Sequence, residues 1–238
     1  MRQLLLKFAR RLAPTHLGGR DSGNTSPAPH ADKGASLMSA VFSSIYESGI
    51  WGRTESRSGF GSNLIQTKGI REELPKLVKE LRAHSILDIP CGDWYWMRHV
   101  ELAVGQYIGA DVMPSLVDYL TRAFALPGRE FRVLDASIDE LPRVDMIFSR
   151  DCLVHFSFAD GLKTLNNFKR SGSQYLVSTT FPNRQSNFDI KTGEWRPINL
   201  CDAPFYLPPP IRVINEGCTE DFPNFSDKSL GVWRLSDM

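Results

Sequence analysis

The chain has 238 residues, enough for one substantial domain with an appendage. Its 28 basic and 27 acidic residues nearly cancel, so the overall charge gives no electrostatic reason to expect a nucleic acid or an acidic polymer as partner. The four cysteines are widely spaced and form no C-x-x-C pair, so we expect neither a metal site nor a disulfide framework, and a cytoplasmic location. No apolar run approaches the roughly 18 residues that a membrane span needs.

The N-terminal segment differs in composition from the rest of the chain. "MRQLLLKFARRLAP" sets four basic residues around a short apolar core, and the composition of residues 15–35 shifts to Gly, Ser, Pro, Asn and Asp. We expect residues 1–35 to be a flexible basic tail and linker, and residues 36–238 to form the folded domain. Three interpretations of the tail stay open: weak contact with a membrane surface, a transit-like peptide, or a frayed terminus.

Strand and helix patterns alternate along the folded part. Apolar residues at helical spacing predict helices over 67–83, 113–124 and 157–172, and a short helix over 94–100. Five strands are predicted between them, over 85–89, 106–111, 130–136, 144–151 and 173–180. Segments 211–217 and 229–236 resemble a closing antiparallel pair.

This alternation predicts an α/β fold, a Rossmann-like three-layer sandwich with a mostly parallel seven-stranded sheet and an antiparallel C-terminal hairpin. We expect residues 36–66 to form an N-terminal helix and a lid, and residues 181–210 to form an insertion on the acceptor side. In such sheets the ligand lies beyond the carboxyl ends of the strands, where the strand order reverses.

The first of these strand ends reads "LDIPCGDWYW". Asp88 ends the strand, and the turn runs through Pro90, Cys91, Gly92 and Asp93. A dinucleotide site needs the G-x-G-x-x-G pattern, which lets a diphosphate rest on a helix N-terminus. Here a carboxylate and aromatic rings stand in that region, so the turn favours a ligand with an amino-acid end over one with phosphates.

Two further acids follow at the next strand ends. Asp111 stands 23 residues after Asp88, close to the offset at which an acid binds a ribose diol. Asp135 ends the third strand, where it could accept from an adenine amino group, while the small Ala136 leaves room for the ring. A ligand that combines adenine, ribose and an amino-acid tail is S-adenosylmethionine.

These motifs together resemble a known enzyme family. "ILDIPCGD", "YIGAD", "VLDAS" and "DMIFSRDCLVHF" resemble the successive motifs of class I S-adenosylmethionine-dependent methyltransferases, over about residues 85–180. The resemblance implies S-adenosylmethionine as cofactor, with Val112 and Arg150 also beside it. Many members have glycine at the position of Pro90 and another near Asp93, and this chain departs from both. "FSSIYESGIWGRTESRSGFGS" and "PFYLPPP" resemble a bacterial subgroup found beside glycan-synthesis enzymes, which implies a small-molecule or glycan acceptor, methylated at oxygen.

The acceptor side has several candidate residues. His155 and Asp151, after the fourth strand, form a candidate pair of catalytic base and orienter, or one of them is a substrate ligand. The remaining alternative is a histidine satisfied by backbone. Trp51 and Arg57 lie in a glycine-containing segment that suits a lid, with Arg57 as a clamp for the methionine carboxylate, or in a plain surface loop. The insertion carries five aromatic residues that either stack on the acceptor or pack over the sheet end: Phe181, Phe188, Trp195, Phe205 and Tyr206.

Two rival functions remain open at this stage. One is an NAD(P)-dependent oxidoreductase on a related fold, which the missing glycines after Gly92 disfavour. The other is a non-catalytic protein that keeps the methyltransferase fold as a binding module. The residues leave the oligomeric state undetermined.

Overall fold

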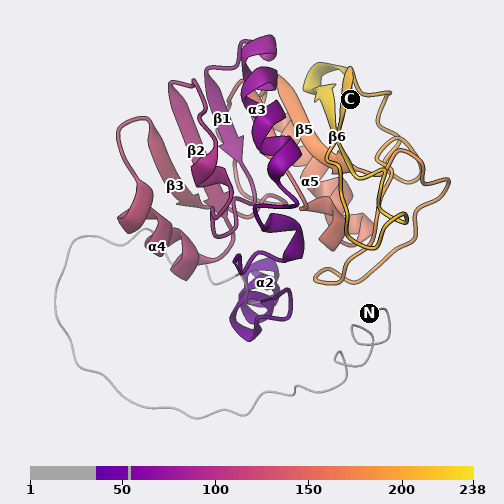
Figure 1. The fold of residues 1–238 in the computed structure, drawn as a ribbon, viewed down its shortest axis with the longest axis horizontal. Helices are drawn as coiled ribbons and strands as arrows, with labels where there is room; N and C mark the ends of the chain where they lie inside the picture. The colour runs from indigo at the N-terminus through magenta and orange to yellow at the C-terminus, as the bar shows by residue number, and fades with distance from the viewer. Residues whose placement is uncertain (1–35, 53–54) are drawn as a thin grey trace. The chain divides into compact units, whose positions relative to one another are not determined.

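The computed structural model describes residues 36–52 and 55–238, and the predicted N-terminal tail lies outside them. A seven-stranded sheet has the order β3-β2-β1-β4-β5-β7-β6 (Figure 1). Its strands are β1 Ser85–Asp88, β2 Gln106–Asp111, β3 Arg129–Val133, β4 Met146–Ser149, β5 Tyr175–Thr180, β6 Arg212–Asn215 and β7 Ser229–Arg234. The first five are parallel, and β7 pairs antiparallel with both β5 and β6. The predicted fold class is therefore confirmed.

Helices cover both faces of this sheet. They are α2 Leu37–Ser48, α3 Lys68–Leu81, α4 Pro114–Phe124 and α5 Phe158–Arg170. Helices α3 and α4 pack on one face, while α2 and α5 belong to the core on the other face, and Figure 1 shows α3 in front of the sheet and α5 behind it. The predicted helices over 67–83, 113–124 and 157–172 correspond to α3, α4 and α5.

The buried strands contribute alternate residues to the two cores. On β1, Ile86 packs with α3 and α4, whereas Leu87 packs with the α5 side. Met146 and Ile147 of β4 divide in the same way. This period of two follows from the pleat of the strands. It also determines the face of the sheet toward which each acid at a strand end points.

The predicted short helix over 94–100 is wrong. Gly92 and Trp94 both have positive φ, at 54° and 55°, so the chain cannot continue as an α-helix directly after the turn. Only a 3-10 turn, Met97–His99, follows. The helix N-terminus that would cradle a diphosphate after β1 is therefore missing from this fold.

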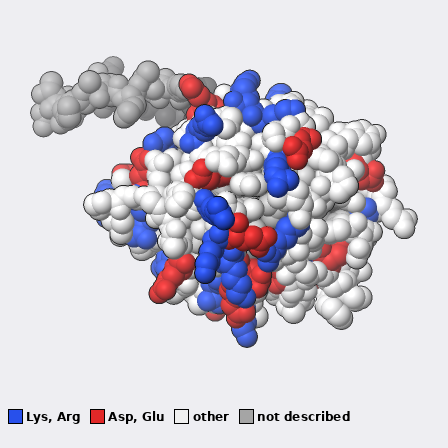
Figure 2. All heavy atoms as spheres, turned by 90° about the horizontal axis from the view of Figure 1, so that it is seen from above, with Lys and Arg blue, Asp and Glu red and all other residues white. Residues whose placement is uncertain are grey.

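The surface shows no strong separation of charge on the face that Figure 2 presents. Basic and acidic side chains lie beside one another on that face. Within the described residues, no helix combines the length and the apolar character needed to cross a membrane.

Candidate functional site

A pocket opens at the carboxyl ends of the strands, where the chain leaves β1 toward β2 on one side and β4 lies on the other. This is the point at which the strand order reverses, as predicted. The pocket holds about 980 Å³ of empty space, counted out to open solvent. Of the predicted site residues, its lining includes Trp51, Asp88, Pro90, Cys91, Gly92, Asp93, Asp111, Val112, Ala136, Arg150, Asp151 and His155. Arg57 and Asp135 are not among the lining residues.

Asp88 is the most deeply buried acid of the pocket. The Tyr107 hydroxyl donates to Asp88 Oδ2, and the Trp94 indole donates to the Tyr107 oxygen at 2.8 Å. Burial raises the pKa of Asp88 to about 7, although the Tyr107 hydrogen bond opposes this shift. At neutral pH this carboxyl is therefore divided between its neutral and charged forms.

Asp111 is held by the backbone of the neighbouring turns. Its Oδ2 accepts from the Gly92 N–H and its Oδ1 from the Met113 N–H, both at 3.2 Å. Burial raises the pKa of Asp111 to about 6, and these backbone bonds limit the rise. Two oxygens fixed in this way at the end of β2 can accept further hydrogen bonds from a pair of hydroxyls.

Asp93 ties the loop after α2 to the turn after β1. Its carboxylate accepts from the Ser56 hydroxyl at 2.9 and 3.0 Å and from the Arg57 N–H at 2.7 Å. The Asp93 N–H donates in return to the Ser58 hydroxyl at 2.9 Å. The Arg57 guanidinium lies over the Tyr46 ring, 4.6 Å from its centroid, and donates to the Tyr46 carbonyl. Arg57 therefore does not line the pocket, which disagrees with its expected role as a clamp for the methionine carboxylate. Asp93 holds the loop through its hydrogen bonds to Ser56 and Arg57.

We expect Gly92→Ala to lower the free energy of unfolding by about 1–2 kcal/mol, because a side chain at positive φ is strained. An added Cβ would also lie 2.4 Å from Ser58 Oγ. Urea unfolding measures the loss. Gly105→Ala is the matched control, because a Cβ there meets only the His84 carbonyl at 3.7 Å. An equal loss in both variants would contradict the argument.

Asp135 points its carboxylate at the chain rather than into the pocket. Its Oδ2 accepts from the Ser36 hydroxyl at 2.8 Å, and its Oδ1 accepts from both the backbone and the hydroxyl of Ser137. Ser36 is the N-cap of α2 and also accepts from the Ser39 N–H. Asp135 thus fixes the start of α2 over the pocket, and its neighbour Ala136 lines the wall.

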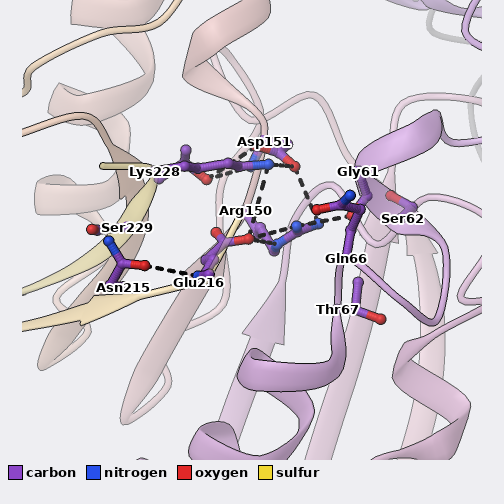
Figure 3. A network of polar contacts seen from close by, with 12 residues as sticks. Gly61, Ser62, Gln66, Thr67, Arg150, Asp151, Asn215, Glu216, Lys228 and Ser229 are labelled. Carbon is purple, nitrogen blue, oxygen red and sulfur yellow. Dashed lines mark hydrogen bonds and ion pairs between the residues drawn. The ribbon is translucent and has the colours of Figure 1, made fainter. Parts of the chain in front are cut away.

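A buried ion network lies beside the pocket at the end of β4 (Figure 3). Arg150 donates through Nε and Nη2 to Glu216 Oε2, at 3.0 and 2.6 Å, and through Nη2 to the Gly61 carbonyl at 2.9 Å. Lys228 reaches Asp151 Oδ2 at 2.7 Å, and Arg150 Nη1 reaches the same oxygen at 3.1 Å. The donors of Arg150 are therefore engaged by protein acceptors.

Asp151 has the character of a fixed anion. Burial opposes its ionisation, but the neighbouring cations of Arg150 and Lys228 hold the pKa of Asp151 well below its usual value. Its N–H donates to the Thr179 hydroxyl at 2.8 Å, with Asp151 at φ 53°. A carboxylate this acidic is a poor proton acceptor, so of the two predicted catalytic residues only His155 has the properties of a base.

His155 is oriented by the backbone of the insertion and not by Asp151. Its Nδ1 lies 2.9 Å from the Glu194 carbonyl, so Nδ1 carries the proton and Nε2 is the basic atom of the ring. Burial lowers the pKa of His155, which keeps the ring neutral at pH 7. The Trp51 ring packs against it with a centroid distance of 4.8 Å. The backbone therefore satisfies Nδ1 of this histidine, which is one of the residues that line the pocket.

The segment 193–196 clamps the turn that carries His155. The Gly193 N–H donates to the His155 carbonyl at 2.8 Å, and the Arg196 N–H donates to the Val154 carbonyl at 3.0 Å. The fully buried Arg196 guanidinium donates to the Phe156 carbonyl at 2.7 Å. Burial lowers the pKa of Arg196 to about 10. The insertion therefore holds this turn of the pocket through its backbone and through the Arg196 side chain.

None of the five aromatic residues of the insertion is among the residues that line the pocket. Phe181 is buried against Trp195, and Phe205 is buried against Phe158 of α5. Phe188 and Tyr206 are exposed. This placement favours packing over the sheet end, and it gives no support to direct stacking on an acceptor.

Several residues of the site were not predicted from the sequence. Tyr46 and Phe42 of α2 line the pocket, and their signal was the aromatic spacing in "VFSSIYESG". Burial raises the pKa of Tyr46 to about 12, and the charge of Asp93 adds to the shift. Glu216 and Lys228 lie more than 60 residues from Arg150 and Asp151 and follow no local pattern. Among residues 36–52 and 55–238, no three or more His, Cys, Asp or Glu side chains are grouped to hold a metal ion.

Comparisons with known proteins identify the architecture. No protein-family model matches the chain, and no curated protein is similar to it in sequence. Among solved structures, the N-methyltransferase NodS from Bradyrhizobium japonicum WM9 matches with a TM-score of 0.54 at 12% identity, over 74% of this chain and 98% of NodS. The 1,6-didemethyltoxoflavin-N1-methyltransferase from Burkholderia thailandensis, with bound 1,6-didemethyltoxoflavin and S-adenosylhomocysteine, matches at 0.52 and 14% identity, over 89% and 92% of the two chains. The methyltransferase domain of bacterial CtHen1-C matches at 0.52 and 15% identity, over 73% and 99%. The chain therefore has the Rossmann-like fold of these methyltransferases.

Proposed function

We propose that this chain is an S-adenosylmethionine-dependent methyltransferase that acts on a small-molecule or glycan acceptor, at oxygen. The observation that carries the proposal is the chemistry of the pocket between β1 and β4, where the strand order reverses. Three carboxylates, of Asp88, Asp93 and Asp111, stand where a dinucleotide site would need glycines and a helix N-terminus. The shared fold of the three solved methyltransferases adds to this argument.

The residues present fit the cofactor. Asp111 offers two fixed acceptor oxygens for a ribose diol, and Ala136 and Val112 leave an apolar wall suited to a purine ring. The acids around Asp88 favour a cationic amino-acid end. When bound, the cofactor supplies an activated methyl group; the chain supplies alignment and exclusion of water.

His155 supports an acceptor that must lose a proton. A neutral imidazole whose Nδ1 is bonded to the Glu194 carbonyl, in a residue that lines the pocket beside Trp51, suits a hydroxyl acceptor. Two of the solved structures are described as N-methyltransferases, so oxygen needs a direct test. With S-adenosylmethionine labelled at the methyl carbon and pooled sugars or amines, the carbon chemical shift of the product separates O-methyl from N-methyl. An N-methyl product alone would contradict the oxygen proposal.

Calorimetry with S-adenosylhomocysteine and NAD⁺ tests the cofactor class. We expect micromolar binding of S-adenosylhomocysteine and none of NAD⁺. The reverse result would support the oxidoreductase alternative. Tight binding of S-adenosylhomocysteine with no methyl transfer to any acceptor pool would support the non-catalytic alternative.

We expect Asp111→Ala to weaken S-adenosylhomocysteine binding by about 1.5–3 kcal/mol, the usual loss when charge-assisted hydrogen bonds disappear. Calorimetry measures the change. Asp118→Ala is the matched control, because Asp118 lies on the exposed side of α4 and pairs only with Arg122 on the surface. Unchanged affinity in Asp111→Ala would contradict its ribose role.

The domain boundaries and the cellular location belong to the same proposal. Residues 36–238 would form the methyltransferase domain, with 36–66 as helix and lid and 181–210 as the insertion that carries Glu194 beside His155. We propose a cytoplasmic enzyme whose basic tail, residues 1–35, makes at most weak contact with a membrane surface.

A further inference from the structure

Hydrogen bonds connect three buried side chains in a line that ends at Asp88 of the pocket. The Trp94 indole N–H donates to the Tyr107 oxygen at 2.8 Å, and the Tyr107 hydroxyl donates to Asp88 Oδ2. All three residues are at most 5% exposed. Trp94 follows the turn, Tyr107 lies on β2 and Asp88 ends β1, so the line crosses two strands of the sheet.

Donor and acceptor chemistry fixes the direction of this line. An indole nitrogen can only donate, so the Tyr107 oxygen must be the acceptor of that bond. The single hydroxyl proton of Tyr107 is then directed to Asp88 Oδ2. A proton taken up by Asp88 therefore resides on Oδ1, the oxygen to which Tyr107 does not donate. Asp88 is itself one of the residues that line the pocket.

The conformation of Trp94 is part of this arrangement. Its φ of 55° is unusual for a bulky residue and costs free energy, which the surroundings must supply. The Arg129 guanidinium lies over the indole, 4.6 Å from its centroid, and Phe131 packs edge-on at 5.4 Å. The packing holds the N–H in line with Tyr107.

Building on the proposed function, we propose that Tyr107 and Trp94 are positioning residues that keep the tyrosine hydroxyl hydrogen-bonded to Asp88 Oδ2. Oδ1 is then the oxygen that accepts from the ammonium group of the cofactor, and the ammonium group binds when Asp88 is ionised. In this step the O–H bond of neutral Asp88 breaks and its proton goes to solvent water, and the ligand cation then pairs with the carboxylate; no covalent bond forms between ligand and protein.

The groups facing Asp88 set the pH range of this exchange. Burial raises the pKa of Asp88 to about 7; the negative charge of Asp111 adds to the rise, whereas the Tyr107 bond and Arg150 oppose it. Burial also raises the pKa of the Cys91 thiol in the same turn, so that thiol stays neutral. Affinity for a cationic ligand is therefore expected to increase as the pH rises through about 7.

Calorimetry on the full chain tests the proposal, with S-adenosylhomocysteine as the probe between pH 5.5 and 9. In Tyr107→Phe the carboxylate loses a charge-assisted hydrogen bond, so we expect the midpoint of the affinity profile to move up by about one pH unit. The affinity at high pH should stay within about threefold of the native value. Tyr175→Phe, on β5 and outside the pocket lining, is the matched control and should leave the midpoint unchanged.

A second variant and a second measurement guard against misfolding. Trp94→Phe keeps a ring and removes the N–H, and it should move the midpoint in the same direction by a smaller amount. Carbon-13 NMR titration of the Asp88 carboxyl in ligand-free protein should show the same shifts. Native and Tyr107→Phe profiles with one midpoint would overturn the positioning role. No binding to the native protein at any pH would instead overturn the proposed function, and this inference with it.

Discussion

Glu216→Ala should lower the free energy of unfolding by about 3–5 kcal/mol, because it leaves a buried guanidinium without its principal partner. The Arg150 and Glu216 side chains are only 4% and 1% exposed, and Glu216 Oε2 takes two of the Arg150 hydrogen bonds. Urea unfolding at pH 7.5 measures the change.

Two further variants separate this explanation from simple loss of packing. Glu73→Ala removes ion pairs with Lys76 and Arg212 in which the Glu73 side chain is about one third exposed, and it should cost less than about 1 kcal/mol. Adding Arg150→Met to Glu216→Ala should recover much of the loss, because no unpaired charge then remains. A loss below about 1 kcal/mol in Glu216→Ala would show that Asp151 alone can neutralise Arg150.

Asp88→Asn should stabilise the ligand-free protein by about 2–4 kcal/mol at pH 8, because a pKa raised by about three units opposes folding of the ionised form. Burial raises the pKa of Asp88 from 3.8 to about 7. Between these values the unfolded chain releases the proton and the folded protein retains it, so stability falls as the pH rises through that window. Asparagine removes the charge and retains an oxygen that can accept from Tyr107.

Thermal unfolding from pH 4 to pH 8 tests this prediction. The profile of Asp88→Asn should be flatter than that of the native protein, and S-adenosylhomocysteine should bind at least about tenfold more weakly, since a charge-assisted contact is worth more than 1.4 kcal/mol. Asp118→Asn, on the exposed side of α4, should change stability by less than about 0.5 kcal/mol. A native profile that is flat over this range would contradict the buried-charge argument.

The local pattern of the chain was sufficient for the elements and for the side of the sheet that carries the site. The predicted strands that end at Asp88 and Asp111 run parallel and place both acids at one edge of the sheet, although the helix predicted between them does not form. The apolar stripes predict α3, α4 and α5 to within a few residues, because each helix must bury one face. These features depend on neighbours close in sequence.

The turn after β1 shows where local reasoning fails. Aromatic residues after Gly92 fit a helix pattern, yet Trp94 adopts a positive φ because packing with Arg129 and Phe131 outweighs its local preference. Those two residues lie on β3, more than 30 positions away. Local propensity depends on neighbours in the sequence, so it cannot predict a contact between residues that are this far apart in the chain.

The sequence by itself determined the strand-end acids and the absence of a phosphate-binding turn, since both follow from residue types at short spacing. Tertiary structure alone decided which of those acids face the pocket. Asp135 turns toward Ser36, Asp151 is neutralised by Arg150 and Lys228, and His155 takes its orientation from the Glu194 carbonyl. These partners are distant in the chain, and a side chain's protonation and direction depend on whichever charges and dipoles folding brings within a few ångströms of it.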